Sequence, residues 1–577
     1  MQPSLLLLAL ASAAAASPTH SPLAPRGQTC RKLPQDKDWP SQPIWSVLNA
    51  TVGGRLIATT PLASPCHDPN YDAAKCDALR AGWVRTSQKP ANVTSFESST
   101  SIVAPYFQNQ SCDPFTPRSS ACKVGTYPSY AVKVTKASDA IAGMLFAQLN
   151  NVRLVIKNTG HDLLGRSTGT GGLSLWTHYL KDITIKDYTS SSYTGKAMKM
   201  GAGVQAYEAY DAAHKQNLRV VGGTCPTVGL AGGYTQGGGH SMLSTIHGLG
   251  ADQVLEWEVV TANGSLLTAT PDKNSDLYWA LSGGGGGTYG LVLSMTVKAY
   301  ADTKVTGAML TLIQQGADDA FWNGITLFHA AMTSYTDAGA AFGYYLGQGI
   351  MAIQPVTFPG KSKAEVAALM LDLTKKLDAA GTVYTLTITE FSNYYEFFNN
   401  YYGPLPYGTY TSAQVQGGRL IPRQVVATAS ANQAFTDALK TIVSDQDFHV
   451  VGVGLDVSKT ATASNAVHPK WRSTAITIVV AANWDYTQPF AANTANETLI
   501  TNKYDPLLTT VTGADSGAYV NEGDFQQPSF QDNFFGSNYA KLRSIKNKYD
   551  PNSLFYATKL VGSEDWTVQA DGRLCKA

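Results

Sequence analysis

Two reactive side chains lie in glycine-rich stretches of this 577-residue chain. His161 is part of Asn158-Thr-Gly-His-Asp162, and Cys225 is part of residues 222–241, eight of which are glycine. Backbone of this kind reaches positive φ or approaches a bulky group closely, and its N–H groups can hold a large, flat or phosphate-bearing ligand. Because His161 and Cys225 are both nucleophiles, the two loops predict a ligand cradle with possible attachment points.

These motifs resemble the berberine bridge enzyme-like flavoproteins of the vanillyl-alcohol oxidase superfamily, from about residue 125 to the C-terminus. In that family a His is joined to the flavin 8α-methyl group, and the Cys of a Cys-Pro-Thr-Val-Gly motif is joined to flavin C6. His161 and Cys225 match these positions, so the resemblance implies FAD held by two covalent bonds. The other residues expected around the cofactor are Thr159, Gly160, Asp162, Gly165, Pro226, Thr227, Val228, Gly229, Gly232, Gly233, Gly237, Gly238 and Gly239.

The resemblance also points to Tyr519-Val-Asn-Glu522 as the catalytic segment. The family commonly uses a tyrosine of a Tyr-x-Asn-Tyr segment as the base, and here Glu522 replaces the second tyrosine. Either Glu522, with a pKa tuned by burial, is the base, or a nearby tyrosine such as Tyr519 is, or the substrate differs in kind; Asn521 is the third expected residue of the site. A purely structural ion pair or hydrogen bond of Glu522 is the alternative. Val228 matches a proposed oxygen gate, at which Val favours an oxidase.

We therefore expect a secreted FAD-dependent oxidase that removes hydride from an alcohol, carbohydrate or secondary-metabolite substrate and reduces O2 to H2O2. One alternative is a flavoenzyme of secondary metabolism that performs oxidative cyclisation or carbon–carbon desaturation. Another is a secreted glycan-binding protein without catalysis. A nicotinamide dehydrogenase is disfavoured, because the Gly-x-Gly-x-x-Ala segment at 201–206 is followed by an apolar stretch that ends in glycines and not in an acidic residue.

Composition places the chain among ordinary globular proteins. It is 44% hydrophobic and 15% charged with a net charge of +1, so neither nucleic acid nor a membrane is an expected partner. The apolar run from Leu5 to Ala16 is typical of a signal-peptide core and shorter than the roughly 20 residues of a membrane helix. We expect a monomer that acts on a small molecule and O2, with N-glycans at some of Asn49, Asn92, Asn109, Asn263 and Asn496.

The seven cysteines support an oxidising compartment. Their spacing suggests that Cys66 pairs with Cys76, Cys112 with Cys122, and Cys30 with Cys575. Cys225 then has no partner, as a flavin attachment residue requires, although a buried free thiol is the alternative. His240 and His247 lack a third ligand at metal-site spacing, so no metal is expected.

The chain is longer than the roughly 250–300 residues of one hydrophobic core, so several domains are expected. A helix over 137–150 and a strand over 153–156 directly precede the His161 loop, and strand-like segments alternate with helical ones beyond about residue 300. This pattern predicts an α+β protein. With the family's PCMH-type FAD domain of two α+β subdomains and a substrate domain built on a large antiparallel sheet, the expected division is signal peptide 1–17, disulfide-containing cap 18–125, FAD-binding domain 126–302, substrate domain 303–515 and C-terminal berberine-bridge segment 516–577.

Overall fold

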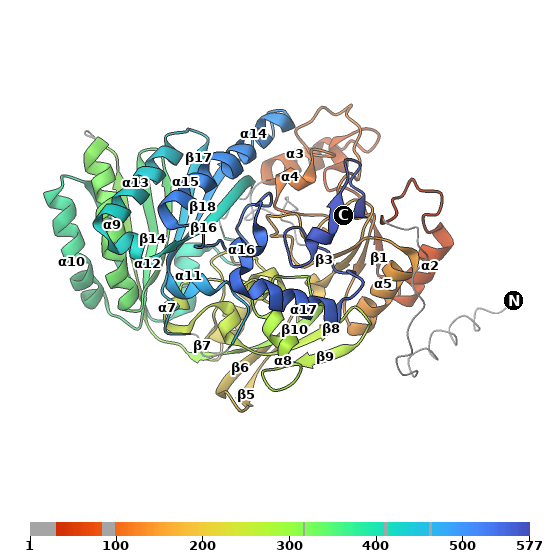
Figure 1. Cartoon of the computed structure of the whole chain (residues 1–577), viewed down its shortest axis with the longest axis horizontal. Helices are drawn as coiled ribbons and strands as arrows, with labels where there is room; N and C mark the ends of the chain where they lie inside the picture. The colour runs from red at the N-terminus through yellow and green to blue at the C-terminus, as the bar shows by residue number, and fades with distance from the viewer. Residues whose placement is uncertain (1–29, 84–97, 316–317, 409–412, 461–463) are drawn as a thin grey trace.

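The computed structural model of this chain describes residues 30–83, 98–315, 318–408, 413–460 and 464–577. Two small sheets form one half of the molecule, and a seven-stranded sheet with its helices forms the other (Figure 1). The expected signal peptide, residues 1–17, and the sequon residue Asn92 lie outside the described residues.

The His161 loop begins where strand β3 (Leu154–Lys157) ends. This strand belongs to a four-stranded sheet of order β1-β2-β4-β3, in which β2 (Tyr130–Lys133) and β3 both run parallel to β4 (Leu173–Trp176) and β1 (Leu56–Ala58) pairs antiparallel with β2. Parallel strands need a crossover, and helix α5 (Ala137–Asn150) makes it between β2 and β3 over the predicted residues. The buried strand therefore fixes the start of the loop.

A second, five-stranded antiparallel sheet has the order β5-β6-β10-β8-β9. Its strands are β5 (Ile183–Thr189), β6 (Thr194–Gly201), β10 (Leu291–Lys298), β8 (Val254–Val260) and β9 (Leu266–Ala269), with α6 (Ala206–His214) and α8 (Ser275–Leu281) nearby. A Cβ atom on Gly201 or Gly203 would lie 2.3 or 2.0 Å from a carbonyl oxygen of the chain. These glycines therefore serve close backbone packing in an antiparallel sheet, and the segment is no dinucleotide-binding turn.

The third sheet is large and antiparallel throughout, as predicted, with the order β15-β12-β14-β13-β17-β18-β16. Its strands are β12 (Val305–Ile313), β13 (Ala341–Gly347), β14 (Ile350–Pro359), β15 (Val383–Phe391), β16 (Gln414–Pro422), β17 (Phe448–Gly454) and β18 (Thr474–Asn483). Three long helices cover one face, namely α9 (Asp318–Asp337), α10 (Lys363–Ala379) and α13 (Ala429–Val443) (Figure 1). Helix α11 (Tyr394–Tyr402) packs on the β12–β15 end of the other face, and the rest of that face can line a site.

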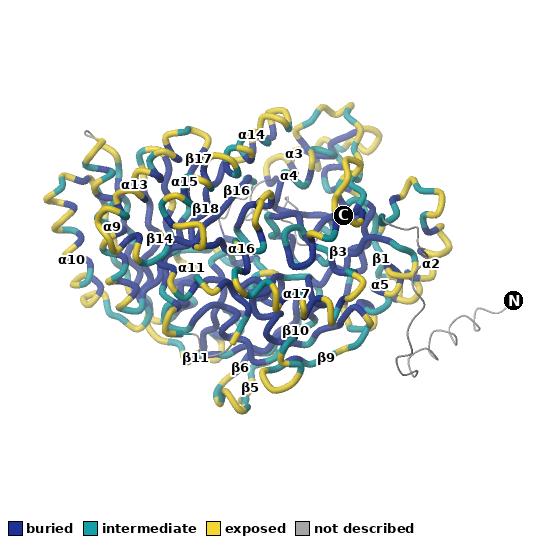
Figure 2. The backbone as a smooth tube through the Cα atoms, in the orientation of Figure 1, coloured by how far each residue is buried: buried dark blue, intermediate teal, exposed yellow. Residues whose placement is uncertain are grey.

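The C-terminal part of the chain returns from this sheet to the first half. Helices α14 (Phe490–Leu499) and α15 (Asp505–Thr512) pack against β16, and α17 (Tyr539–Tyr549) then packs against α8 (Figure 1). The sheets form the buried interior, whereas the outer helices expose one side (Figure 2). This path places the Tyr519–Glu522 segment between the two halves.

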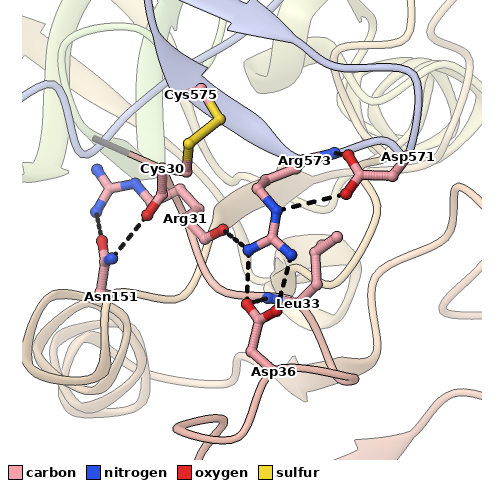
Figure 3. The surroundings of a disulfide bond; sticks show 8 residues. All are labelled: Cys30, Arg31, Leu33, Asp36, Asn151, Asp571, Arg573 and Cys575. Carbon is pink, nitrogen blue, oxygen red and sulfur yellow. Dashed lines mark hydrogen bonds and ion pairs between the residues drawn. A yellow bond between two sulfur atoms is a disulfide. The ribbon is translucent and has the colours of Figure 1, made fainter. Parts of the chain in front are cut away.

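The two ends of the described chain are tied together by the disulfide between Cys30 and Cys575 (Figure 3). Beside it, Arg573 donates to both carboxylate oxygens of Asp36 at 2.6 and 2.7 Å, and this bond lowers the pKa of Asp36 to about 2. The other two expected disulfides, Cys66–Cys76 and Cys112–Cys122, are also present, and Cys225 is the free cysteine of the described residues.

Removing the terminal disulfide in a Cys30→Ser/Cys575→Ser variant is expected to lower the free energy of unfolding by about 2–5 kcal/mol, because the bond closes a very long loop in the unfolded chain. An Arg573→Met variant is the matched control at the same place. It removes a half-buried ion pair and should cost only about 1 kcal/mol. Denaturant unfolding measures the free energy of unfolding of both variants. A larger loss in Arg573→Met than in the disulfide variant would contradict the prediction that the disulfide stabilises this region more than the ion pair does.

No helix among the described residues is both long and apolar enough to cross a bilayer. Two of the sequon asparagines, Asn109 and Asn263, have exposed side chains. Asn49 and Asn496 are half-buried, and Asn49 Oδ1 accepts a hydrogen bond from the Leu56 amide.

Candidate active site

A cavity of about 870 Å³ opens between the glycine loops and the face of the seven-stranded sheet opposite the three long helices. Its lining comes from loops that follow buried strands, from the sheet itself and from the C-terminal segment. The predicted site residues that line it are Thr159, Gly160, His161, Asp162, Cys225, Val228, Gly229, Gly232, Gly233, Tyr519, Asn521 and Glu522. The fold thus brings both expected attachment residues and the expected catalytic segment to one space.

The other predicted cofactor residues lie behind the cavity wall. Gly165 packs against the Phe107 ring, and Pro226 packs against Gly408. Residues 237–239 form the turn under the catalytic segment, where a Cβ on Gly237 would lie within 2.6 Å of the Asn521 amide group. These residues shape the loops and do not face the cavity.

Thr227 links the two expected attachment residues. His161 Nε2 lies 2.8 Å from Thr227 Oγ1, and Cys225 Sγ lies 3.4 Å from the same oxygen. One hydroxyl group therefore holds an imidazole and a thiol side by side at one end of the cavity.

Both nucleophiles are uncharged in this environment. Burial lowers the pKa of His161 to about 3, and the nearby Lys157 lowers it further in the same direction. Burial raises the pKa of the Cys225 thiol, although hydrogen bonding with Thr227 partly opposes that shift. At neutral pH His161 is thus a neutral imidazole.

The catalytic segment is fixed to the glycine loop by Tyr519 and Asn521. The Tyr519 hydroxyl accepts hydrogen bonds from the Gly239 amide at 3.1 Å and from Asn521 Nδ2 at 2.8 Å. Asn521 Nδ2 also donates to the Gly233 carbonyl at 2.8 Å. Asn521 therefore holds the two chains together, and Tyr519, whose pKa is raised by burial and then by Glu522, stays protonated.

Glu522 forms a hydrogen-bonded pair with a histidine of the glycine loop. Glu522 Oε1 lies 2.8 Å from His240 Nε2, and the Glu522 side chain is 25% exposed against 11% for His240. Burial by itself would lower the pKa of His240, but the Glu522 carboxylate outweighs it and the pKa is raised. The Glu522 carboxylate therefore lines the cavity with the His240 imidazole in contact with one of its oxygens.

Neither His240 nor His247 takes part in a metal centre within the described part of the chain. No group of three or more His, Cys, Asp or Glu side chains is placed there to hold an ion. The His247 ring instead stacks on Tyr300 at 3.7 Å between centroids.

The polar groups of the cavity lining suit FAD. Among the lining residues, Asn158 Oδ1 and Gln236 Oε1 are buried without a hydrogen-bond partner in the described structure. Arg166 is the single Lys or Arg among them, and its Nε and Nη1 donate to the carbonyls of Thr558 and Val520. Its Nη2 is buried without a described partner, so the guanidinium has capacity left for an anion such as the FAD diphosphate.

The backbone of the cavity wall also suits FAD. Gly233 lies in a π-helical turn, Leu230–Tyr234, and a Cβ atom built on it meets nothing within 4 Å. Gly286 packs closely on Gly233, and Gly287 lies beside Ile156. These glycines keep one wall flat, as a large planar ring requires.

A Gly233→Leu variant is expected to fold but to lose FAD, because its side chain would fill the space in front of the π-helical turn. Gly233 has ordinary negative φ, so no backbone strain is added. Circular dichroism reports the fold, and the flavin absorbance per protein reports the cofactor. A Gly233→Leu protein with full flavin content would mean that the ring does not lie against this turn; Gly233→Ala should fall between the two.

The sequence analysis missed several lining residues. His240 was considered only as a metal ligand, although its place in the glycine loop opposite Glu522 is the signal that would have paired them. Arg166 directly follows Gly165 in the His161 loop and was not predicted to line the cavity. The lining side chains of the seven-stranded sheet could not be found, because no local pattern marks which face of a strand points to a distant loop.

Comparison with known proteins agrees with this geometry. A family model described as FAD binding domain matches residues 128–270, and one described as Berberine and berberine like matches residues 518–561. The FAD-linked oxidoreductase ZEB1 of Gibberella zeae is 46% identical over 551 residues, which is 95% of each chain. The bifunctional decalin synthase calF of Penicillium decumbens is 40% identical over 563 residues, 96% of this chain and 97% of that protein.

Solved structures support the same fold. The VAO-type flavoprotein MtVAO615 from Myceliophthora thermophila superposes with a TM-score of 0.92 at 42% identity, over 95% of this chain and all of that one. Berberine bridge enzyme from Eschscholzia californica has a TM-score of 0.66 at 16% identity over 90% of this chain and 98% of its own, which shows the fold alone. The expected PCMH-type fold is thus confirmed, and the non-catalytic alternative is set aside. The chain belongs to the berberine bridge enzyme-like, VAO-type family of FAD-linked oxidoreductases.

Proposed function

We propose that this protein is a secreted oxidase with FAD attached through His161 and Cys225, which oxidises an alcohol group and transfers the electrons to O2 to give H2O2. The observation that carries this proposal is that the paired nucleophiles and the His240–Glu522 pair open into one cavity. Bound FAD would supply the hydride acceptor. The chain supplies the attachment residues, the base and the shape of the cavity.

Glu522 is the proposed base. A substrate hydroxyl group must lose its proton as hydride leaves the carbon, and a positioned carboxylate does this well. Tyr519 is the poorer choice, because its hydroxyl already accepts two hydrogen bonds and burial raises its pKa. His240 holds Glu522 in place through the 2.8 Å contact between its Nε2 atom and Glu522 Oε1.

Val228 supports the oxidase assignment. It lines the cavity three residues after Cys225, where the family's proposed gate lies, and its side chain is small. O2 reaching this point would be close to the attachment end of the cavity.

Peroxide release tests the proposal. Purified yellow protein is given a panel of alcohols in air, and H2O2 is measured beside the carbonyl product; the expected ratio is one to one. Under nitrogen the same alcohols should bleach the flavin without peroxide. Bleaching that persists after air is admitted would identify a dehydrogenase and contradict the oxidase.

Oxidative cyclisation or desaturation is the second candidate function. It is supported by the likeness to a protein named a decalin synthase and by the Glu522–His240 pair, which can also accept a proton from carbon. Product analysis separates the two: a carbonyl group supports alcohol oxidation, and a new ring or alkene supports the second function.

Export is part of the proposal. Three disulfides suit an oxidising compartment. Expression in a fungal host should place the protein in the medium, with a mobility shift after removal of N-glycans.

A further inference from the structure

The wall of the cavity opposite the glycine loops is one face of the seven-stranded sheet. The lining side chains alternate along its strands, as Ile350, Ala352 and Gln354 do on β14 and as His449, Val451 and Val453 do on β17. Alternation of this kind means that every second residue faces the cavity.

Strand register places a row across this face in which Tyr345 lies among small apolar residues. Tyr345 lies opposite both Ala352 and Val451, Val451 lies opposite Val479, and Val479 lies opposite Gly418. Directly paired residues share a face, so this row runs unbroken over five strands. It ends beneath the catalytic segment, because a Cβ atom on Gly418 would lie 2.9 Å from the Glu522 carbonyl oxygen.

This face has no charged side chain among its described lining residues. Its histidine, His449, has its pKa lowered by burial and is therefore neutral at pH 7. An ionic group of a substrate would lose its water here without gaining a partner, and a sugar would place hydroxyl groups against valines and an alanine. The described part of this face contributes two rings, Tyr345 and His449, whose centroids lie 5.3 Å apart.

Polar groups flank the row, and Gln354, His449 and Asn483 are among those that line the wall. One further polar group, on Thr477, is buried without a partner in the described structure. Thr477 lies opposite Val453, is 2% exposed, and its Oγ1 has no hydrogen-bond partner in the described structure. A single carbonyl or hydroxyl group of a ligand would satisfy it. The nearby amides are already used, since Gln416 donates to the Glu522 carbonyl and accepts from Gln414.

We propose that the substrate is an uncharged molecule with an apolar, ring-like body, which lies on the row from Ala352 to Gly418 and directs its reacting group to Glu522. Carboxylates, phosphates, amines and oligosaccharides are poor ligands of this wall. The inference rests on the proposed oxidation at this site and narrows its substrate class.

The test measures ligand binding under nitrogen as the absorbance change of the oxidised flavin on mixing, before any bleaching. The probes are 4-tert-butylbenzyl alcohol, 4-(hydroxymethyl)benzoate and cellobiose. The first should bind about tenfold or more tighter than either other probe, and a Val451→Arg variant should reverse the order of the first two by a similar factor. Leu371→Arg is the matched control, because it adds the same charge at a half-exposed site on α10; it should leave all three affinities unchanged.

Preference of the unmodified protein for the benzoate or for cellobiose overturns the inference, as does failure of all three to bind. So does a Val451→Arg variant that keeps the original order. Should Arg at this position prevent folding, Val451→Gln, which should weaken the tert-butyl probe alone, replaces it. Reoxidation of chemically reduced protein by air tests the oxidase proposal separately, since it needs no ligand on this wall.

Discussion

A His161→Ala/Cys225→Ala double variant is expected to release all of its FAD into the supernatant when the protein is precipitated with acid, whereas either single variant keeps the flavin in the pellet. The reason is that Thr227 holds both nucleophiles at the same end of the cavity, so each can retain the cofactor without the other. Absorbance of pellet and supernatant, with the mass of the intact protein, measures the outcome.

His178→Ala is the matched control for this experiment. His178 is a second buried imidazole whose pKa burial lowers to about 3, and it does not line the cavity. Its removal should leave the attachment intact. Flavin that is lost from the unmodified protein, or retained by the double variant, would show that these two residues are not the attachment points.

Local sequence patterns were sufficient for the elements around the cofactor loop. The helix over 137–150 was predicted with its observed bounds because its apolar spacing is helical, and the strand over 153–156 was predicted one residue early, since β3 spans Leu154–Lys157. The disulfide pairs also followed from spacing. The helix, the strand and the Cys66–Cys76 and Cys112–Cys122 pairs each have their signal within one short segment, whereas Cys30 and Cys575 are 545 positions apart.

Two strands of the large sheet were missed, and both contribute to the cavity. β13 contains Gly343 and Gly347, and β16 contains Gly417 and Gly418, so both look like loops. At Gly347, Gly417 and Gly418 neighbouring groups lie too close for a side chain, as the Glu522 carbonyl does at Gly418, whereas Gly343 has room for a Cβ atom. Tertiary packing there overrides a weak strand propensity, which no single-segment pattern reveals.

The partnership of Glu522 with His240 was beyond the sequence for a similar reason. The two residues are 282 positions apart, and they meet only because the C-terminal segment returns to the glycine loop. The departure of Glu522 from the family's tyrosine was visible in the sequence. The role of Glu522 in the site could be recognised only once His240 was found beside it.

Glu522→Gln is expected to lower kcat by about 10²- to 10⁴-fold with little change in flavin content, because the amide keeps the shape but cannot accept the proton. A Tyr519→Phe variant should lose less, since the hydroxyl acts as a hydrogen-bond acceptor for Gly239 and Asn521. Rates of flavin reduction under nitrogen measure both. Near-normal reduction in Glu522→Gln together with a large loss in Tyr519→Phe would move the base to Tyr519.

The pH profile gives an independent check on the same pair. The pKa of His240 is raised above its ordinary value of 6.5 because Glu522 stabilises the imidazolium. Below that raised pKa an imidazolium beside Glu522 opposes the arrival of a further proton, and above it the imidazole is neutral and this opposition is gone. kcat/KM should therefore rise with pH through a value above 6.5, and His240→Gln should remove this rise while Glu522 still supports turnover. A profile that is unchanged in His240→Gln would mean that His240 does not govern the protonation of the base.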